Sequence, residues 1–248
     1  MRTSLTDSGG RPVHLELDVR TPCAPQPLPP CPWAFPDPRR ASAAGLISSG
    51  GDFEPATIVA AYRLGIFPWP HPEAEYLWFS PDPRAILPPE NLKISRRLGR
   101  TIRSGGFHVT IDAAFEEVMR CCGECRPEGT WITPALLRGY VELHRLGWAH
   151  SVEVWTGEDE LAGGLYGVGV GAMFGAESMF HRVRDASKVA LAALAQHALA
   201  IGIELVDIQV LTEHTERMGG IEIPRSRYLT LLERATAHEA AWRTGQRA

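Results

Sequence analysis

The sequence of 248 residues lacks an apolar run long enough to cross a membrane. Its longest nearly apolar stretch, residues 189–206, contains Gln196, His197 and Glu204, whereas a spanning helix needs about 20 predominantly apolar residues. The N-terminus also lacks the apolar segment of a secretory signal, because Arg2 is followed by Thr, Ser, Asp and Gly. We therefore expect a cytoplasmic protein with no membrane partner.

An excess of positive charge and a set of paired cysteines are also missing. The chain has 25 Lys and Arg against 29 Asp and Glu, a net charge of −4, which excludes a globally basic protein of the histone type. Five scattered cysteines do not suggest a disulfide framework. Cys122 and Cys125 form a C-x-x-C pair, but Cys23, Cys31 and the histidines supply no second pair at a zinc-site spacing. We expect no metal site.

Proline is concentrated near the N-terminus. Eight of the 20 prolines lie between Pro22 and Pro38, and the first thirty residues or so show no sustained apolar period. We expect residues 1–32 to form a flexible, Pro-rich extension. The prolines at positions 81 and 83 mark a boundary, which predicts a small N-terminal domain over residues 33–82, a larger domain over residues 83–240 and a tail over residues 241–248.

The rest of the chain predicts helices on both sides of a block of strands. Apolar spacing, caps and terminating glycines favour helices over residues 55–65, 96–104, 112–122, 134–146, 185–201, 213–218 and 226–238. Alternation and repeated glycines favour strands over residues 77–79, 152–155, 161–170, 173–180 and 203–210. We expect an α+β fold with an antiparallel-rich, mixed central sheet flanked by helices.

The strand predicted over residues 203–210 carries a carboxylate and an amide on one face. Asp207 and Gln209 are two residues apart, so their side chains point the same way. Asp207 could accept a hydrogen bond from the Gln209 amide nitrogen and leave the amide oxygen toward an incoming N–H group. The alternative is an ordinary strand whose polar side faces solvent.

Glu177 stands inside an otherwise apolar strand, between Phe174 and Phe180. A buried carboxylate needs a cationic or hydrogen-bonding partner. Glu177 could therefore receive a cationic group of a substrate, or it could pair with a structural partner. Arg182, Arg184 and Lys188 are the nearby candidates for the structural pairing.

One predicted helix is strongly basic. Lys93, Arg96, Arg97, Arg100 and Arg103 fall within eleven residues that contain no acid, which favours an anionic partner such as phosphate. The alternative is a charged, solvated helix face. Trp69 and Trp131, beside Pro or Gly, are candidate platforms for base stacking, although many tryptophans only fill a core.

Nine short motifs, in order along some two hundred residues, resemble those of the leucyl/phenylalanyl-tRNA-protein transferase family. They are GGD (50–52), AYRLGIFPW (61–69), WFSPDPR (78–84), GTWIT (129–133), HSVEVW (150–155), GGLYGV (163–168), ESMF (177–180), ASK (186–188) and EIPR (222–225). No single motif is decisive, but the ordered set is specific. The resemblance runs from about residue 35 to about residue 232.

This resemblance implies a GNAT-like catalytic domain and an enzyme that needs neither coenzyme A nor a metal. Such enzymes move Leu or Phe, and sometimes Met, from leucyl-tRNA or phenylalanyl-tRNA to the α-amine of proteins that begin with Arg or Lys, which marks them for N-end-rule degradation. The implied roles are catalysis for Asp207 and Gln209, acceptor binding for Glu177, adenosine binding for Trp69 and Trp131, a side-chain pocket of Leu165, Phe174 and Met179, and tRNA binding by Lys93, Arg96, Arg97, Arg100 and Arg103.

Three positions differ from the family pattern. Ile208 replaces the usual Cys between Asp207 and Gln209, Ala176 replaces a Gly, and Thr212 replaces an Asn. Two other functions remain open. A coenzyme A-dependent N-acetyltransferase would carry a glycine-rich pyrophosphate turn before the helix near residue 185, and none is found. A catalytically silent binder of aminoacyl-tRNA would leave an acceptor peptide unmodified.

Overall fold

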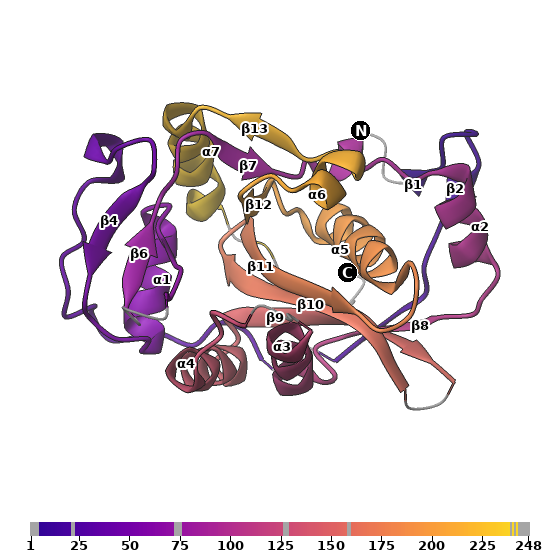
Figure 1. The fold of residues 1–248 in the computed structure, drawn as a ribbon, viewed down its shortest axis with the longest axis horizontal. Helices are drawn as coiled ribbons and strands as arrows, with labels where there is room; N and C mark the ends of the chain where they lie inside the picture. The colour runs from indigo at the N-terminus through magenta and orange to yellow at the C-terminus, as the bar shows by residue number, and fades with distance from the viewer. Residues whose placement is uncertain are drawn as a thin grey trace.

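A computed structural model describes residues 5–20, 23–71, 76–125, 129–157, 160–238, 240 and 242. Its main feature is an eight-stranded sheet with the order β13-β7-β12-β11-β10-β9-β8-β3 (Figure 1). The strands are β3 (Leu17–Val19), β7 (Arg84–Ile86), β8 (His108–Ile111), β9 (Ala149–Thr156), β10 (Glu160–Val170), β11 (Met173–His181), β12 (Leu205–Gln209) and β13 (Ile221–Ile223).

The sheet is mixed. β11 and β12 run parallel, as do β3 and β8, and the other neighbours are antiparallel. β9, β10 and β11 follow one another in the chain and pair antiparallel as a meander, whereas the helix between β11 and β12 provides the crossover that a parallel pair requires. The predicted α+β class with a mixed, mainly antiparallel sheet is confirmed.

Seven α-helices surround the sheet among the described residues. They are α1 (Pro55–Arg63), α2 (Arg96–Arg103), α3 (Phe115–Glu124), α4 (Pro134–Arg145), α5 (Ala186–Ile201), α6 (Glu213–Arg217) and α7 (Arg225–Ala237). The predicted caps are confirmed for two of them, because Ser95 accepts from the Leu98 N–H and Thr133 accepts from the Leu136 N–H. Glu54 is the N-cap of α1, without a side-chain hydrogen bond to the helix.

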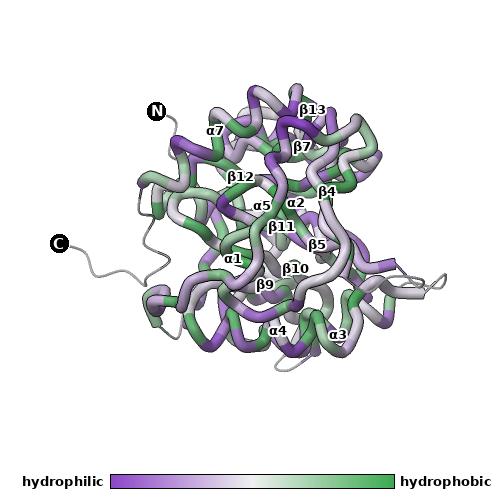
Figure 2. The backbone as a smooth tube through the Cα atoms, turned by 90° about the vertical axis from the view of Figure 1, so that its left-hand side faces the viewer, coloured by the Kyte–Doolittle hydropathy of each residue, from purple (hydrophilic) through white to green (hydrophobic). Residues whose placement is uncertain are grey.

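Two hydrophobic clusters lie on opposite faces of the sheet. One contains buried residues of α1, α3, α4 and α7, and the other contains those of α2 and α5. Along α4 the hydrophobic and hydrophilic residues alternate, as a helix with one buried face requires (Figure 2). α5 is buried almost all round, which explains its continuous apolar sequence. No described helix is long and apolar enough to cross a membrane.

The N-terminal segment differs from its prediction. We expected a flexible extension over residues 1–32, but residues 5–19 contain three short strands and several buried side chains, whereas residues 23–32 form no helix or strand. β1 (Leu5–Thr6) pairs with β2 (Pro12–Val13), β3 adds an edge strand to the main sheet, and Leu5, Val13 and Leu15 are buried against α2 and α5. These strands precede the Pro-rich stretch, and a few well-spaced apolar residues are enough to dock them on the core.

A second, three-stranded sheet has the order β4-β6-β5 and lies beside α1 (Figure 1). Its strands are β4 (Leu46–Ser49), β5 (Phe67–Pro68) and β6 (Leu77–Phe79), and two short 3₁₀ helices cover Pro38–Arg40 and Pro89–Asn91. The Trp69 N–H donates to the Leu77 carbonyl, so Trp69 leaves β5 on an extended segment, as expected. The proposed boundary near residue 82 stays a prediction.

Candidate active site

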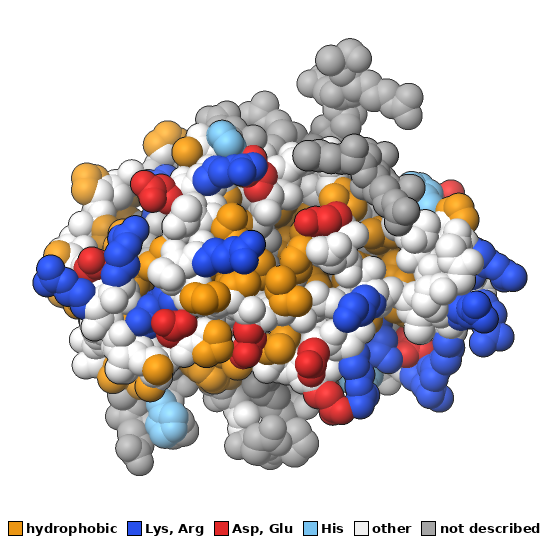
Figure 3. All heavy atoms as spheres, turned by 90° about the horizontal axis from the view of Figure 1, so that it is seen from above, with side chains coloured by type: hydrophobic (Ala, Val, Ile, Leu, Met, Phe, Trp, Pro, Cys, Tyr) orange, Lys and Arg blue, Asp and Glu red, His pale blue; other side chains and the backbone are white. Residues whose placement is uncertain are grey.

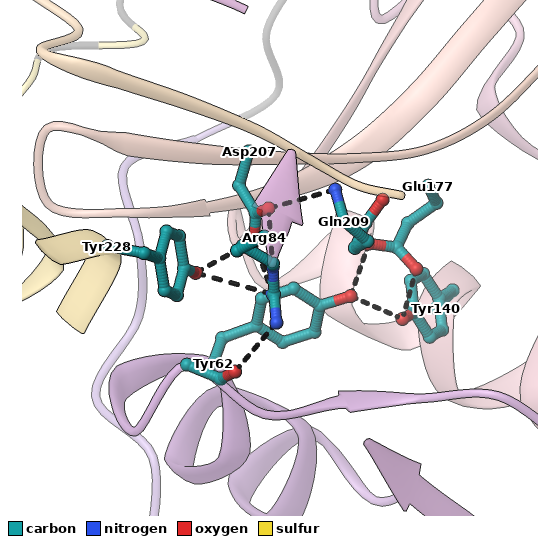
Figure 4. Close-up of polar contacts among 8 residues, drawn as sticks. Tyr62, Arg84, Tyr140, Glu177, Asp207, Gln209 and Tyr228 are labelled. Carbon is teal, nitrogen blue, oxygen red and sulfur yellow. Dashed lines mark hydrogen bonds and ion pairs between the residues drawn. The ribbon is translucent and has the colours of Figure 1, made fainter. Parts of the chain in front are cut away.

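A buried ion pair holds the centre of the site. Both Asp207 and Arg84 have side chains with no exposed surface, and Arg84 donates to both carboxylate oxygens of Asp207, at 2.9 Å from Nε and 2.6 Å from Nη2. The Tyr228 hydroxyl donates to Asp207 Oδ2 at 2.8 Å, and the Gln209 backbone N–H donates to Oδ1 at 2.9 Å (Figure 4). Asp207 therefore accepts four hydrogen bonds, and it is not among the residues that line the pocket described below.

Arg84 is held as firmly as its partner. Its Nη1 donates to the Gly65 carbonyl at 3.1 Å, and its guanidinium lies over the rings of Phe67 and Tyr228 at 4.7 and 4.4 Å. Burial lowers the pKa of Arg84, but the Asp207 carboxylate more than offsets this, so the pKa is raised above its usual value. The pair is charged, and we infer that it fixes β7, β12 and α7 to one another.

A β-bulge places Glu177. Tyr166 of β10 is opposite Ser178 and Gly167 is opposite Ala176, so Glu177 is the extra residue of β11. The bulge breaks the alternation of the strand: Glu177 points toward the helices α1 and α4, whereas Met179 packs on the α5 side.

Glu177 is surrounded by neutral donors rather than by cations. Tyr62 from α1 donates to Oε1, Tyr140 from α4 donates to Oε2 at 3.2 Å, and the Gln209 amide nitrogen donates to Oε1 at 2.9 Å (Figure 4). The suggested pairing with Arg182, Arg184 or Lys188 is not found. Burial raises the pKa of the Glu177 carboxyl to about 8; the tyrosine hydroxyls oppose this rise, and the Asp207 carboxylate adds to it.

Gln209 links the two carboxylates, but not as expected. We predicted that its amide nitrogen donates to Asp207; instead the backbone N–H makes that contact and the amide nitrogen donates to Glu177. Gln209 has a φ of 55°, in the left-handed region, at an irregularity in the pairing of β12 with β7. Among the described residues, its amide oxygen has no hydrogen-bond partner and is free to accept one.

A pocket of about 230 Å³ opens above Glu177 and Gln209. Both indoles line it, together with part of β5 and the end of β12; the lining residues are Phe67, Pro68, Trp69, Trp131, Glu177, Ile208, Gln209, Val210 and Thr212. Trp69 is 42% exposed, so its ring is a surface platform rather than core. The structure thus brings Glu177, Gln209, Trp69 and Trp131 together, as the sequence suggested.

Three predicted residues lie elsewhere. Leu165 and Phe174 are buried in the cluster beneath α5, and half-buried Met179 packs against the same cluster. None of them lines the pocket between the indoles. Leu165 is opposite Met179 across β10 and β11, so these residues do share one face, but it is the face opposite Glu177.

The predicted basic helix is present as α2, but some of its arginines are paired with acids. Arg97 pairs with Asp185, and Arg103 pairs with Asp7 at 2.9 Å. The row is therefore partly compensated by acids that are distant in sequence. Lys93, Arg96 and Arg100 are exposed. Lys and Arg side chains gather at the end of the molecule that carries α2 (Figure 3).

Comparison with known proteins supports one family between residues 51 and 233. The family model for leucyl/phenylalanyl-tRNA protein transferase matches residues 86–233, and the model for the N-terminal domain of the same transferase matches residues 51–82. The chain belongs to the leucyl/phenylalanyl-tRNA–protein transferase family.

Relatives of this family are similar over most of the chain. A leucyl/phenylalanyl-tRNA–protein transferase of Anaeromyxobacter sp. (strain K) is 53% identical over 205 residues, which cover 82% of this chain and 88% of the relative. Those of Yersinia enterocolitica and Magnetococcus marinus are 50% and 47% identical, over 81% and 82% of this chain and 85% and 89% of the relatives.

The departures from the family pattern have local explanations. Ile208 is 7% exposed and belongs to the α5-side cluster, as expected for a substitution on the face away from Asp207. Thr212 is the N-cap of α6 and forms a capping box with Thr215. The Ala176 side chain packs in the α5-side cluster, next to the bulge that turns Glu177 the other way.

Sequence reasoning missed the four residues that surround the two carboxylates in this structure. Arg84, Tyr228, Tyr62 and Tyr140 were given no role, although a carboxylate between apolar residues in an inner strand requires a buried donor. The need for a buried donor could be read from the sequence, but the identity of the donor could not.

Among the described residues, no group of three or more His, Cys, Asp or Glu could hold a metal ion.

Proposed function

We propose that this protein transfers Leu, Phe or Met from aminoacyl-tRNA to the α-amine of proteins that begin with Arg or Lys. The observation that carries the proposal is the meeting of Glu177 and Gln209 at the floor of a pocket flanked by Trp69 and Trp131. Two indoles suit an adenine, since base stacking on one ring contributes about 1–3 kcal/mol. We place this enzyme in the cytoplasm, where it would mark proteins for N-end-rule degradation.

The reaction needs an amine held against an ester that is already activated. The amine nitrogen forms a bond to the ester carbonyl carbon, the bond from that carbon to the ribose oxygen breaks, and the amine proton passes to the ribose oxygen, directly or through water. Gln209 can support this step because its free amide oxygen accepts an N–H of the amine. An α-amine has a pKa of about 8, so a useful fraction is neutral at pH 7.

Glu177 is the proposed site for the acceptor's first side chain. With a pKa of about 8, its carboxyl is mostly protonated at neutral pH when no cation is present. A guanidinium or ammonium group placed beside it would favour the ionised form and lower this pKa. Binding a basic acceptor would therefore release a proton from Glu177. An acceptor with a neutral first side chain would not gain the attraction to the ionised carboxylate.

Asp207 has a positioning role in this proposal. Its contacts with Arg84, Tyr228 and the Gln209 backbone leave no free oxygen to take a proton from the acceptor. It instead holds Gln209 in its left-handed conformation. The role of Leu165, Phe174 and Met179 in holding the transferred side chain stays a proposal from the resemblance, because none of them lines the pocket between the indoles and only Met179 is half-buried rather than buried. The exposed cations Lys93, Arg96 and Arg100, with Arg97 and Arg103, would bind the tRNA.

The direct test is incubation with labelled leucyl-tRNA and peptides that begin with Arg, Lys, Ala or Glu. We expect label in the Arg and Lys peptides only. Bound tRNA with no labelled peptide would identify a silent binder. Label in all four peptides would contradict the role of Glu177, and labelling from acetyl coenzyme A would indicate an N-acetyltransferase.

A second test addresses Gln209. Gln209→Ala should lower kcat about 100-fold, because an amine that is held in the wrong place loses the advantage of proximity, while tRNA binding persists. Gln26→Ala is a matched control, since Gln26 is exposed and remote from the pocket. Unchanged transfer by Gln209→Ala would remove the proposed site.

A further inference from the structure

The N-terminal segment, which precedes the family matches, is docked on the basic helix α2. The Ser8 N–H donates to the Ile94 carbonyl at 2.7 Å, just before α2 begins. Leu5 and Val13 are buried in the same cluster as Leu98 of α2. The Gln196 side chain of α5 exchanges two hydrogen bonds with the Leu15 backbone, at 2.9 and 2.8 Å. The segment is thus tied to two helices.

Asp7 organises this junction. One of its oxygens accepts from the Gly9 and Arg11 N–H groups and closes the turn, while the other accepts from Arg103 at 2.9 Å. Gly99 makes the contact possible, because a Cβ at this position would lie 2.7 Å from the Asp7 carboxylate. A glycine inside a helix costs about 1 kcal/mol relative to alanine, and here it allows the turn to approach α2.

The turn and the helix enclose a cleft of about 380 Å³. Its lining residues are Asp7, Gly9, Arg11, Arg96, Arg100 and Arg103. Asp7 is neutralised by Arg103, whose side-chain hydrogen bond lowers the pKa of that carboxyl. Within the described ranges, no carboxylate pairs with Arg11, Arg96 or Arg100. Three arginines without a carboxylate partner therefore line one open cleft.

Helix α6 and Lys93 link the aromatic pocket to the start of α2, whose arginines line the cleft. Thr212 lines the pocket and caps α6, and Met218 at the other end of α6 accepts a hydrogen bond from the Lys93 N–H. Lys93 is exposed, and α2 begins three residues later. A polyanion that leaves the pocket along α6 would meet Lys93 and then Arg96 and Arg100.

We propose that Arg11 of the N-terminal turn, together with Arg96 and Arg100, binds a backbone phosphate of RNA in this cleft. The inference rests on the proposed function, since it assigns the RNA to the same tRNA whose end enters the pocket. Guanidinium groups match phosphate geometry with two parallel hydrogen bonds, and they keep their charge at all physiological pH values. The N-terminal segment is thereby part of the nucleic-acid surface.

The test compares Arg11→Ala with the unaltered enzyme in leucyl-tRNA binding from 50 to 200 mM salt. One lost phosphate contact lowers the slope of log affinity against log salt by about 0.7–0.9, so the affinity ratio should shrink about threefold across this range. KM for leucyl-tRNA should rise at low salt with kcat unchanged. Arg20→Ala is the control, because Arg20 lies in the same segment but is paired with Asp18.

An inorganic phosphate titration distinguishes an RNA contact from a site for a free anion. Loss of phosphate binding in Arg11→Ala with an unchanged tRNA salt slope would overturn the proposal, and so would equal slopes in all three proteins. These results differ from failure of the proposed function, in which the unaltered enzyme itself transfers no label to an Arg peptide. Arg11→Glu should lower the slope further than Arg11→Ala, and an equal or smaller change would count against the contact.

Discussion

The two carboxylates of the site have opposite surroundings. Asp207 is enclosed with the guanidinium of Arg84, whereas Glu177 is enclosed with the hydroxyls of Tyr62 and Tyr140 and the amide of Gln209. A permanent cation keeps the first pair charged. Neutral donors do not compensate for burial at Glu177, and its pKa rises to about 8.

The contrast separates a structural charge from a titratable one. Asp207 has no free oxygen and no contact with the pocket, so its charge serves to hold Arg84, Tyr228 and Gln209 together. Glu177 lines the pocket and can gain or lose a proton near neutral pH. Gln209 contacts Asp207 through its backbone N–H and Glu177 through its side-chain amide. Of these two carboxylates, only Glu177 can respond to a substrate in the pocket.

The largest expected effect comes from breaking the charged pair. Asp207→Asn leaves the Arg84 guanidinium buried without a counter-charge, which should lower the free energy of unfolding by about 3–5 kcal/mol. Urea unfolding measures this change. The exposed pair of Arg217 with Glu213 offers a control, because Glu213→Gln should change stability by less than about 1 kcal/mol.

A double variant sharpens this result. Replacing Arg84 with Met and Asp207 with Leu removes both charges, and stability should return toward that of the unaltered protein. Transfer should remain low in this variant, because nothing then holds the Gln209 backbone. A stable double variant with full activity would contradict the positioning role of Asp207.

Glu177→Gln tests whether the Glu177 carboxyl titrates near neutral pH. The Glu177 pKa is about 8 in the folded state against a usual 4.5, so the protonated carboxyl stabilises the fold fully below pH 4.5. That contribution is lost as the pH rises from 4.5 through 8, at no more than about 1.4 kcal/mol per pH unit. The variant should therefore become more stable relative to the unaltered protein over this range. Unfolding at several pH values measures the slope.

A flat difference between the two proteins would mean that Glu177 is ionised in the folded state throughout. Glu213→Gln is again the matched control, since it makes the same substitution at an exposed site. Its stability difference should not follow the same pH course.

The sequence was sufficient for elements that depend on local signals. Ser95 and Thr133 mark helix starts, and both side chains cap their helices in the structure. The sequence was insufficient where one extra residue in a strand exchanges the faces to which the following side chains point. Because of the bulge at Glu177, Met179 points to the opposite face of the sheet from Glu177, and no residue type in this strand predicts a bulge.

The partners of the carboxylates were beyond reach for a related reason. Arg84 lies 123 residues from Asp207 in the chain, and Tyr62 lies 115 residues from Glu177. Burial of an acid shows that a donor is needed, but only the register of β7 with β12 and the packing of α1 decide which donor arrives. The N-terminal segment was misjudged because its anchors are also distant in the chain: Gln196 lies 181 residues from Leu15, and Arg103 lies 96 residues from Asp7.

Two tyrosines provide a matched pair for a finer comparison. Tyr228→Phe removes a hydroxyl that donates to Asp207 at 2.8 Å. A hydrogen bond to a charged group contributes about 1.5–3 kcal/mol, so urea unfolding should show a loss of that size. The pH course of stability assigned to Glu177 should remain, since Tyr228 donates to the other carboxylate. Loss of that pH course would show that the two sides are not separable.

Tyr140→Phe is expected to have the smallest effect on stability and a distinct effect on titration. The variant loses contacts of 3.2 Å to Glu177 and 3.1 Å to Tyr62, which should cost about 1 kcal/mol because the carboxyl is mostly neutral at pH 7. The Tyr140 hydroxyl lowers the pKa of Glu177, so its removal should move the midpoint of the Glu177 pH course above 8. Stability against pH, taken relative to a Tyr140→Phe/Glu177→Gln double variant, measures this midpoint. A lower midpoint, or a larger loss than in Tyr228→Phe, would place a charge on Glu177 and remove the distinction between the two carboxylates.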